Sequence, residues 1–218
     1  MEDPNFLPEE LIREIQYYLA DRDLGSFQLA SRRLNLAISE AEKLYRRYHH
    51  RDLIDLARIG DLTGVRYLVE YRGADIQMDA ALRRASENGY LEVVKYLVEQ
   101  GADIHSDNDY PLRAAASYGH LAVVNYLVEN EANEILDEVL ILAALNGQLE
   151  IVKYLVEQGA DIHANNDYAL QLAASYGNMP VVKYLVEQGA EITDEALILA
   201  GLRGHLEVVE YLQWALQR

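Results

Sequence analysis

The stretch KYLVEQGADIH occupies residues 95–105, and the same letters occur again, unchanged, at residues 153–163. A shorter copy, KYLVEQGA, returns at residues 183–190. A catalytic centre needs one special place in a chain, whereas a repeated unit builds a surface by stacking copies of itself. The repetition therefore predicts a solenoid, and it directs attention to surfaces before chemistry.

One glycine in each unit marks the period. These turn glycines are residues 60, 89, 119, 147, 177 and 204, with spacings of 29, 30, 28, 30 and 27 residues. A period near 30 is typical of solenoids in which each unit is a pair of short secondary-structure elements. Six turn glycines predict about six units.

The unit at residues 167–192 shows the expected internal order. Asp167 precedes an apolar run and is expected to cap the start of a helix. Leu170 and Ala173 lie on one helical stripe, and Gly177 supplies a left-handed helix end. A second apolar stripe follows and ends at Gly189, and it contains Val181, Val182, Leu185 and Val186. Neither helix buries its stripe alone, so each unit must stack on the next.

The other units keep the same pattern. An aspartate opens each of the last five first helices, at Asp79, Asp109, Asp137, Asp167 and Asp194. A leucine follows three residues later, at Leu82, Leu112, Leu140, Leu170 and Leu197. A tyrosine recurs at one register of the second helix, at Tyr67, Tyr96, Tyr126, Tyr154, Tyr184 and Tyr211. A ladder of this kind is typical of packing rather than of a binding site.

The strings NGYLEVVKYLVEQGADI (88–104) and YGHLAVVNYLVE (118–129) resemble ankyrin repeats, over about residues 51–218. Their sequences are similar to those of the ankyrin arrays of large DNA viruses. The resemblance implies an all-α solenoid, but the family's Thr-Pro-Leu-His tetrapeptide is missing, so we expect the aspartates to act as caps instead. The last residues, EYLQWALQR, include Gln213, Gln217 and Arg218, which favours a C-terminal cap with a polar outer face.

Residues 1–50 lack the repeat pattern, and their apolar spacing predicts three short helices. The order Leu-Pro-x-Glu-Leu-Ile from Leu7, followed by Asp23-Leu24 and Ser-Arg-Arg-Leu at 31–34, resembles an F-box. The usual tryptophan near the end of that motif is absent, and Leu44-Tyr45 stand roughly in its place. The alternative is that these residues are a helical cap for the solenoid.

The F-box resemblance implies partners. F-box proteins bind the SCF adaptor subunit (S-phase-kinase-associated protein) and through it a cullin. Carried over by position, the adaptor-binding residues are Leu7, Pro8, Leu11, Ile12, Ile15, Leu19 and Leu24.

Composition excludes several classes of function. The formal net charge is −17, of which −15 falls after residue 50, so nucleic acid and anionic membrane are not expected partners. The chain has no cysteine and no HExxH, GxxxxGK[ST], GxGxxG or GxSxG motif. We therefore expect no metal, no cofactor and no enzymatic activity. No signal peptide and no apolar run of about 20 residues is evident, and the cytoplasm or nucleus is the expected location.

Ankyrin arrays bind partners with the residues before the turn glycine and near the start of the first helix. Tyrosines at such exposed positions supply rigid contact area of the kind found in binding hot spots. The expected client-binding residues are Tyr110, Tyr118, Leu145, Asn146, Tyr168, Tyr176 and Arg203.

Two functional hypotheses follow. In the first, an F-box-like module (1–50) recruits a ubiquitin ligase while the ankyrin array (51–218) holds a client protein. In the second, the chain is a plain ankyrin scaffold or inhibitor with no role in ubiquitin transfer. Adaptor binding that depends on Leu7, Pro8 and Ile15 distinguishes them.

Overall fold

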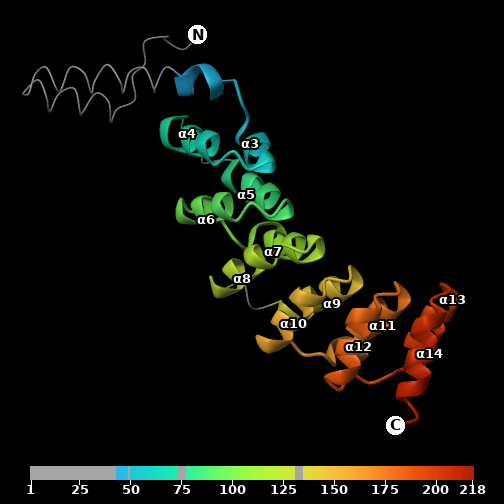
Figure 1. Cartoon of the computed structure of the whole chain (residues 1–218). Helices are drawn as coiled ribbons and strands as arrows, with labels where there is room; N and C mark the ends of the chain where they lie inside the picture. The colour runs from blue at the N-terminus through green and yellow to red at the C-terminus, as the bar shows by residue number, and fades with distance from the viewer. Residues whose placement is uncertain (1–42, 49, 73–76, 131–134) are drawn as a thin grey trace, which may run out of the picture.

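The structure is a computed structural model of the whole chain, and it describes residues 43–48, 50–72, 77–130 and 135–218 (Figure 1). The segment with the F-box resemblance, including all seven predicted adaptor-binding residues from Leu7 to Leu24, lies outside the described residues. The fold described below therefore concerns the repeat region and the few residues that precede it.

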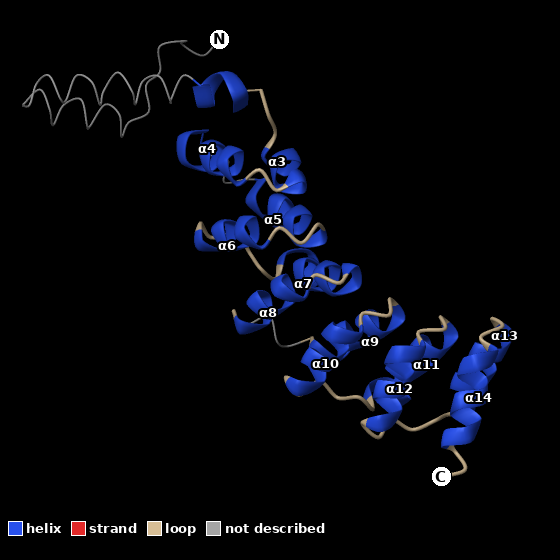
Figure 2. Ribbon diagram, in the orientation of Figure 1, coloured by secondary structure: helices blue, strands red, loops and turns tan. Residues whose placement is uncertain are grey.

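Twelve labelled helices, α3 to α14, form six successive pairs in the described part of the chain, which contains no strand (Figure 2). Their bounds are α3 Leu53–Ile59, α4 Leu62–Arg72, α5 Met78–Glu87, α6 Leu91–Glu99, α7 Ser106–Tyr118, α8 Leu121–Glu129, α9 Leu136–Leu145, α10 Leu149–Glu157, α11 Ala164–Ser175, α12 Met179–Glu187, α13 Asp194–Leu202 and α14 Leu206–Ala215. The predicted order of helix, tight turn, helix and loop is confirmed, and so is the all-helical character of the repeat region.

The helices form two rows along a curved stack (Figure 1). The inner row holds the first helix of each pair (α3, α5, α7, α9, α11 and α13), and the outer row holds the second. Each inner helix contacts the next inner helix along the chain, from α3 with α5 to α11 with α13. The inner row lies on the concave side of the stack, and we call its exposed surface the inner face.

The core lies between the two rows. The leucines expected on the inner helices are fully buried at Leu82, Leu112, Leu140 and Leu170, whereas Leu197 of the last pair is half-buried. Small alanines beside them, such as Ala143 and Ala173, are also fully buried, which lets neighbouring inner helices approach closely. The tyrosine ladder of the outer row packs against this core, so its predicted packing role is confirmed.

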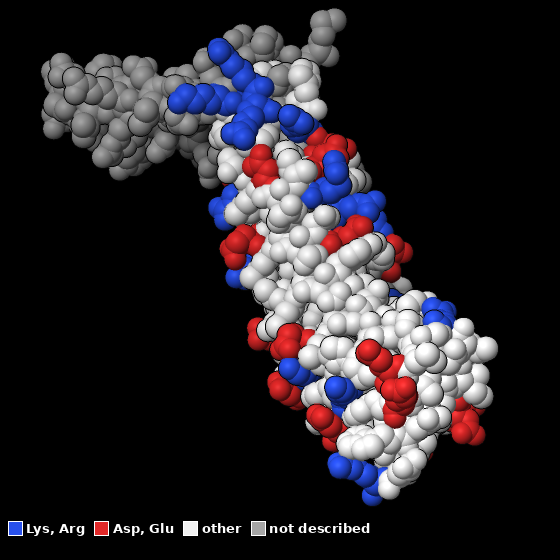
Figure 3. Space-filling view, turned by 45° about the vertical axis from the view of Figure 1, so that its right-hand side comes forward, with Lys and Arg blue, Asp and Glu red and all other residues white. Residues whose placement is uncertain are grey.

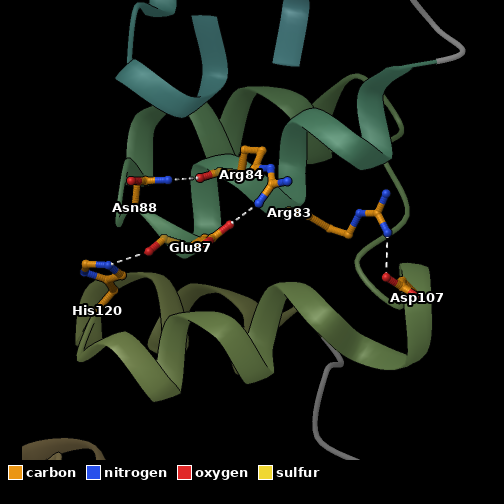
Figure 4. Close-up of polar contacts among 6 residues, drawn as sticks. All are labelled: Arg83, Arg84, Glu87, Asn88, Asp107 and His120. Atoms are coloured by element: carbon orange, nitrogen blue, oxygen red, sulfur yellow. Dashed lines mark hydrogen bonds and ion pairs between the residues drawn. The ribbon is translucent and has the colours of Figure 1, made fainter. Parts of the chain in front are cut away.

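Successive helix pairs meet at the turn glycines. Each has a positive φ, between 72° and 85°, which favours glycine because it has no Cβ. The absence of a Cβ also leaves room for the side chain that begins the next outer helix. His120, for example, lies against Gly89, and its Nε2 donates to the carbonyl of Glu87 at 2.9 Å (Figure 4). Gln148 and Asn178 reach back in the same way to the carbonyls of Ser117 and Leu145.

Asp52 caps α3, where its Oδ1 accepts from the N–H of Ile54, but none of the five aspartates that the sequence pattern assigned as caps does so. In α5 the first residue is Met78, and no side chain caps its N-terminus. In α13 the cap is Thr193, whose Oγ1 accepts from the N–H of Ala196. Three aspartates instead accept a hydrogen bond from the loop that follows the same repeat: Asp79 from the N–H of Asp103, Asp137 from Asp161 and Asp167 from Glu191. They join neighbouring loops rather than end a helix.

A left-handed turn precedes the regular part of α7 and α11. Asp107, Asn108 and Asp109 have φ values of 57°, 58° and 57°. The equivalent residues 165–167 have φ values of 53°, 62° and 57°. Asn and Asp tolerate this conformation better than other residues with a Cβ. Tyr110 and Tyr168 directly follow this turn, at the start of the regular part of α7 and α11.

The last pair exposes polar and apolar side chains together. Gln213, Gln217 and Arg218 are exposed, but so are the large apolar side chains of Ile198, Leu202, Leu206, Trp214 and Leu216. In earlier repeats the positions of Ile198 and Leu202 are occupied by Gln171 and Ser175, which are 7% and 2% exposed because the next pair covers them. The final pair therefore ends the described array with a surface that is polar at Gln213, Gln217 and Arg218 and apolar at Ile198 and Leu202.

Candidate functional site

A hollow on the inner face lies between α7 and α9. It has a volume of about 400 Å³ and is lined by Tyr110, Arg113, Ala114, Ser117, Tyr118, Leu142 and Asn146. Small Ala114 and Ser117 leave the space, and the two tyrosines and Leu142 provide apolar contact area. The structure thus brings together three of the seven predicted client-binding residues, Tyr110, Tyr118 and Asn146.

The exposed tyrosines explain why this face suits a protein partner. Tyr118, Tyr168 and Tyr176 are 59%, 41% and 47% exposed, while Tyr110 is half-buried. Tyrosine offers a large ring and a hydroxyl at a low cost in conformational entropy. Because the core does not use these three side chains, they remain available for contacts with another molecule.

The other predicted residues lie further along the same face. Leu145 is half-buried, and its carbonyl accepts from Nδ2 of Asn178 at 2.9 Å. Arg203 is exposed, and its guanidinium carbon lies 4.2 Å from the centroid of the Tyr176 ring. Arg203 and Tyr176 therefore form a second cluster, two repeats beyond the hollow.

Sequence reasoning missed Arg113, Ala114, Ser117 and Leu142 as lining residues of the hollow. The signal was present in the repeat register. Arg113 and Ala114 lie six and five residues before their turn glycine, Ser117 lies two before it, and Leu142 lies five before the next one. These positions share the inner surface of a helix with the predicted ones.

Ion pairs between successive repeats border the inner face. Nη1 of Arg113 lies 2.8 Å from Oε2 of Glu138, and Nη1 of Arg83 lies 2.6 Å from Oδ2 of Asp107. Arg84 pairs with Glu87 within α5 (Figure 4). In Figure 3 the Lys and Arg side chains gather toward the end of the array nearest the grey residues, and the middle of the array is largely uncharged in that view.

The outer row carries a different feature. The Tyr96 hydroxyl donates to Oε1 of Glu70, which lies in the preceding outer helix, at 3.2 Å. Burial, and then the Glu70 carboxylate, raise the pKa of Tyr96 from 10.0 to about 12. Burial and a glutamate of the preceding repeat also raise the pKa of Tyr126, Tyr154, Tyr184 and Tyr211. This ladder packs the outer helices of successive repeats against one another.

Within the described ranges, no three His, Asp or Glu side chains gather in a way that could hold a metal ion. None of the helices in the described part of the chain is both long and apolar enough to cross a membrane.

A curved stack of helix pairs with an aromatic, hollowed inner face defines a helical-repeat scaffold for protein binding. A family model described as ankyrin repeats, in three copies, matches residues 53–138, 82–166 and 140–215. Because these matches span well over half of the sequence, the chain belongs to the ankyrin-repeat family. A search of curated proteins gave no match. Ankyrin repeats are interaction modules, typically without enzymatic activity, so the class of this protein is a protein–protein interaction scaffold.

Proposed function

We propose that the inner face of this ankyrin array holds a client protein through the hollow between α7 and α9 and the adjacent tyrosines. The observation that carries the proposal is the exposure of Tyr118, Tyr168 and Tyr176 on one face, where the core does not need them. Rigid aromatic side chains around a hollow supply much of the energy of protein interfaces. Leu145 and Arg203 extend the same surface toward the C-terminal pairs.

The test is an unbiased selection of binding peptides on the full chain. We expect selected peptides that bind the wild type and lose binding to a Tyr118→Ser, Tyr168→Ser, Tyr176→Ser triple variant. Glu150→Ser with Lys153→Ser is the matched control, because that ion pair is exposed on α10, a helix of the outer row. Peptides that bind both variants equally would contradict the proposed face.

We further propose that residues 1–50 recruit the SCF adaptor, so that the protein delivers its client to a cullin-based ubiquitin ligase in the cytoplasm or nucleus. The order of residues from Leu7 to Leu34 supports this proposal. The mechanism is proximity: holding a client near the ligase raises its effective concentration without any catalytic residue in this chain. The wording shared with the ankyrin arrays of large DNA viruses favours a viral protein that acts in its host cell.

Co-purification with the adaptor tests the second step. The wild type is expected to bind, a Leu7→Ala, Pro8→Ala variant and an Ile15→Ala variant are expected to lose binding, and the triple tyrosine variant is expected to retain it. Circular dichroism of each variant checks that the repeats stay folded. If the wild type does not bind, residues 1–50 are a helical cap and the protein is a plain ankyrin scaffold or inhibitor.

A further inference from the structure

The hollow beside Tyr118 has a counterpart beside Tyr176. Both tyrosines immediately precede a turn glycine at the C-terminal end of an inner helix. Counted from the turn glycines, the corresponding positions are Tyr110 and Tyr168, Ser117 and Ser175, Tyr118 and Tyr176, Leu142 and Leu199, and Asn146 and Arg203. The two places therefore share their tyrosines, serine and leucine. They differ at three lining positions: Arg113, Ala114 and Asn146 of the first place correspond to Gln171, Leu172 and Arg203 of the second.

The larger Leu172 and Arg203 leave less space at the second place than Ala114 and Asn146 leave at the first. Arg203 places its guanidinium carbon 4.2 Å from the centroid of the Tyr176 ring, well within the range of a cation–π contact. At the first place the residue is Asn146, whose Nδ2 donates to the carbonyl of Leu142 in its own helix at 2.8 Å. Among the described residues, no Lys or Arg lies over the ring of Tyr118, and that side chain is the more exposed of the two tyrosines.

We propose that the hollow between α7 and α9 receives an arginine side chain of the bound partner, stacked on Tyr118 as Arg203 is stacked on Tyr176. The inference rests on the proposed function, since it names the chemistry of the partner that the inner face holds. The volume of about 400 Å³ accommodates one long side chain and the backbone that carries it.

The charges around the hollow favour a cation. Arg113 lines it, but its Nη1 is paired with Oε2 of Glu138 at 2.8 Å, so its charge is compensated locally. The Glu138 side chain is 57% exposed and can accept a further hydrogen bond from a second guanidinium. The net charge of −17 also attracts cationic segments from a distance.

Arginine fits this place better than lysine. A guanidinium is planar, stacks on an aromatic face and still directs donors outward from its edge, whereas an ammonium is more strongly hydrated and has no planar face. One edge of a guanidinium over Tyr118 would remain free for a carboxylate such as that of Glu138. We therefore expect discrimination between arginine and lysine, and not a general preference for positive charge.

The experiment is an NMR titration of the full chain, with its tyrosine rings labelled, by an eleven-residue Gly-Ser peptide that carries one central arginine. We expect saturable shifts of the Tyr118 ring signals, and much smaller ones with lysine or citrulline in place of arginine. Asn146→Arg should weaken binding roughly tenfold, because the new side chain occupies the ring from within. Gln158→Arg adds the same charge at an exposed position at the end of the outer helix α10, so it is the matched control and should bind like the wild type.

Shifts that are equal for arginine and lysine, or unchanged by Asn146→Arg, would overturn the inference and leave only attraction to an acidic surface. No shift at Tyr118 would overturn it as well. A separate experiment tests the proposed function, because it uses peptides selected without regard to their composition. Selected peptides that depend on the inner-face tyrosines but contain no arginine would refute this inference and leave the scaffold function intact.

Discussion

The carboxylate of Asp167 accepts a hydrogen bond of 2.9 Å from the backbone N–H of Glu191, 24 residues further along the chain. Asp167 is 4% exposed, and the same Oδ1 lies 2.9 Å from Nδ1 of His163. One carboxylate thus joins the loop before α11 to the loop before α13. The bond links successive repeats at their loops, far from the core between the two helix rows.

Loss of this hydrogen bond should cost more stability where the aspartate is buried than where it is exposed. We expect Asp167→Ala to lower the free energy of unfolding by about 1–3 kcal/mol, because it leaves partly buried donors without a partner. The equivalent Asp137→Ala should cost about 0.5–1.5 kcal/mol, since Asp137 is exposed and water can replace it. Urea unfolding followed by circular dichroism measures both. Equal losses would contradict the assigned difference in burial.

Substitutions at Gly159 and Gly147 distinguish the stability cost of backbone strain from that of steric contact. Gly159 has a φ of 95°, and a Cβ there would meet nothing within 4 Å, so Gly159→Ala should cost only the left-handed conformation, about 1–2 kcal/mol. At Gly147 the added Cβ would lie 2.8 Å from Oδ1 of Asn178. Gly147→Ala should therefore cost clearly more in thermal or urea unfolding. Similar losses for the two variants would show that Asn178 moves aside freely.

The tyrosine ladder predicts a loss of stability at high pH. Tyr96 has a folded pKa of about 12 and an unfolded value of 10.0, so the unfolded chain loses its proton first. Stability is complete below about pH 10 and falls as the pH rises toward 12, by on the order of 2 kcal/mol for this one group. Unfolding in urea at several pH values measures the slope. Tyr96→Phe should reduce that slope, and an unchanged slope would exclude Tyr96 as its source.

Leucines at two positions test the exposed end of the array. Leu140 is fully buried, and Leu140→Ala should cost about 2–5 kcal/mol. Leu202 is 80% exposed, and Leu202→Ala should change stability by no more than about 0.5 kcal/mol. The two variants are compared by urea unfolding at several protein concentrations. A large, concentration-dependent loss for Leu202→Ala would mean that a second copy covers this surface in solution.

The repeat region illustrates which features follow from local patterns. The turn glycines predicted the number of pairs, and the apolar stripes predicted which leucines are buried, as at Leu112 and Leu170. The exposed positions of Tyr118 and Tyr176 also followed from the repeat register. The aspartates were misread because a short polar side chain near a helix start is a good cap, and only the neighbouring loop shows that a different donor lies within reach.

The sequence by itself determined that this protein is a stack of helix pairs, because each pair has apolar stripes that it cannot bury alone. It also indicated which face of the stack would carry tyrosines. Only the tertiary structure decided that Arg113, Ser117 and Leu142 join Tyr118 around one hollow, and that Arg203 covers Tyr176 while Asn146 leaves Tyr118 open. The physical reason is that a repeat pattern specifies the contacts within and between units, whereas a site depends on how side chains of different units meet in space.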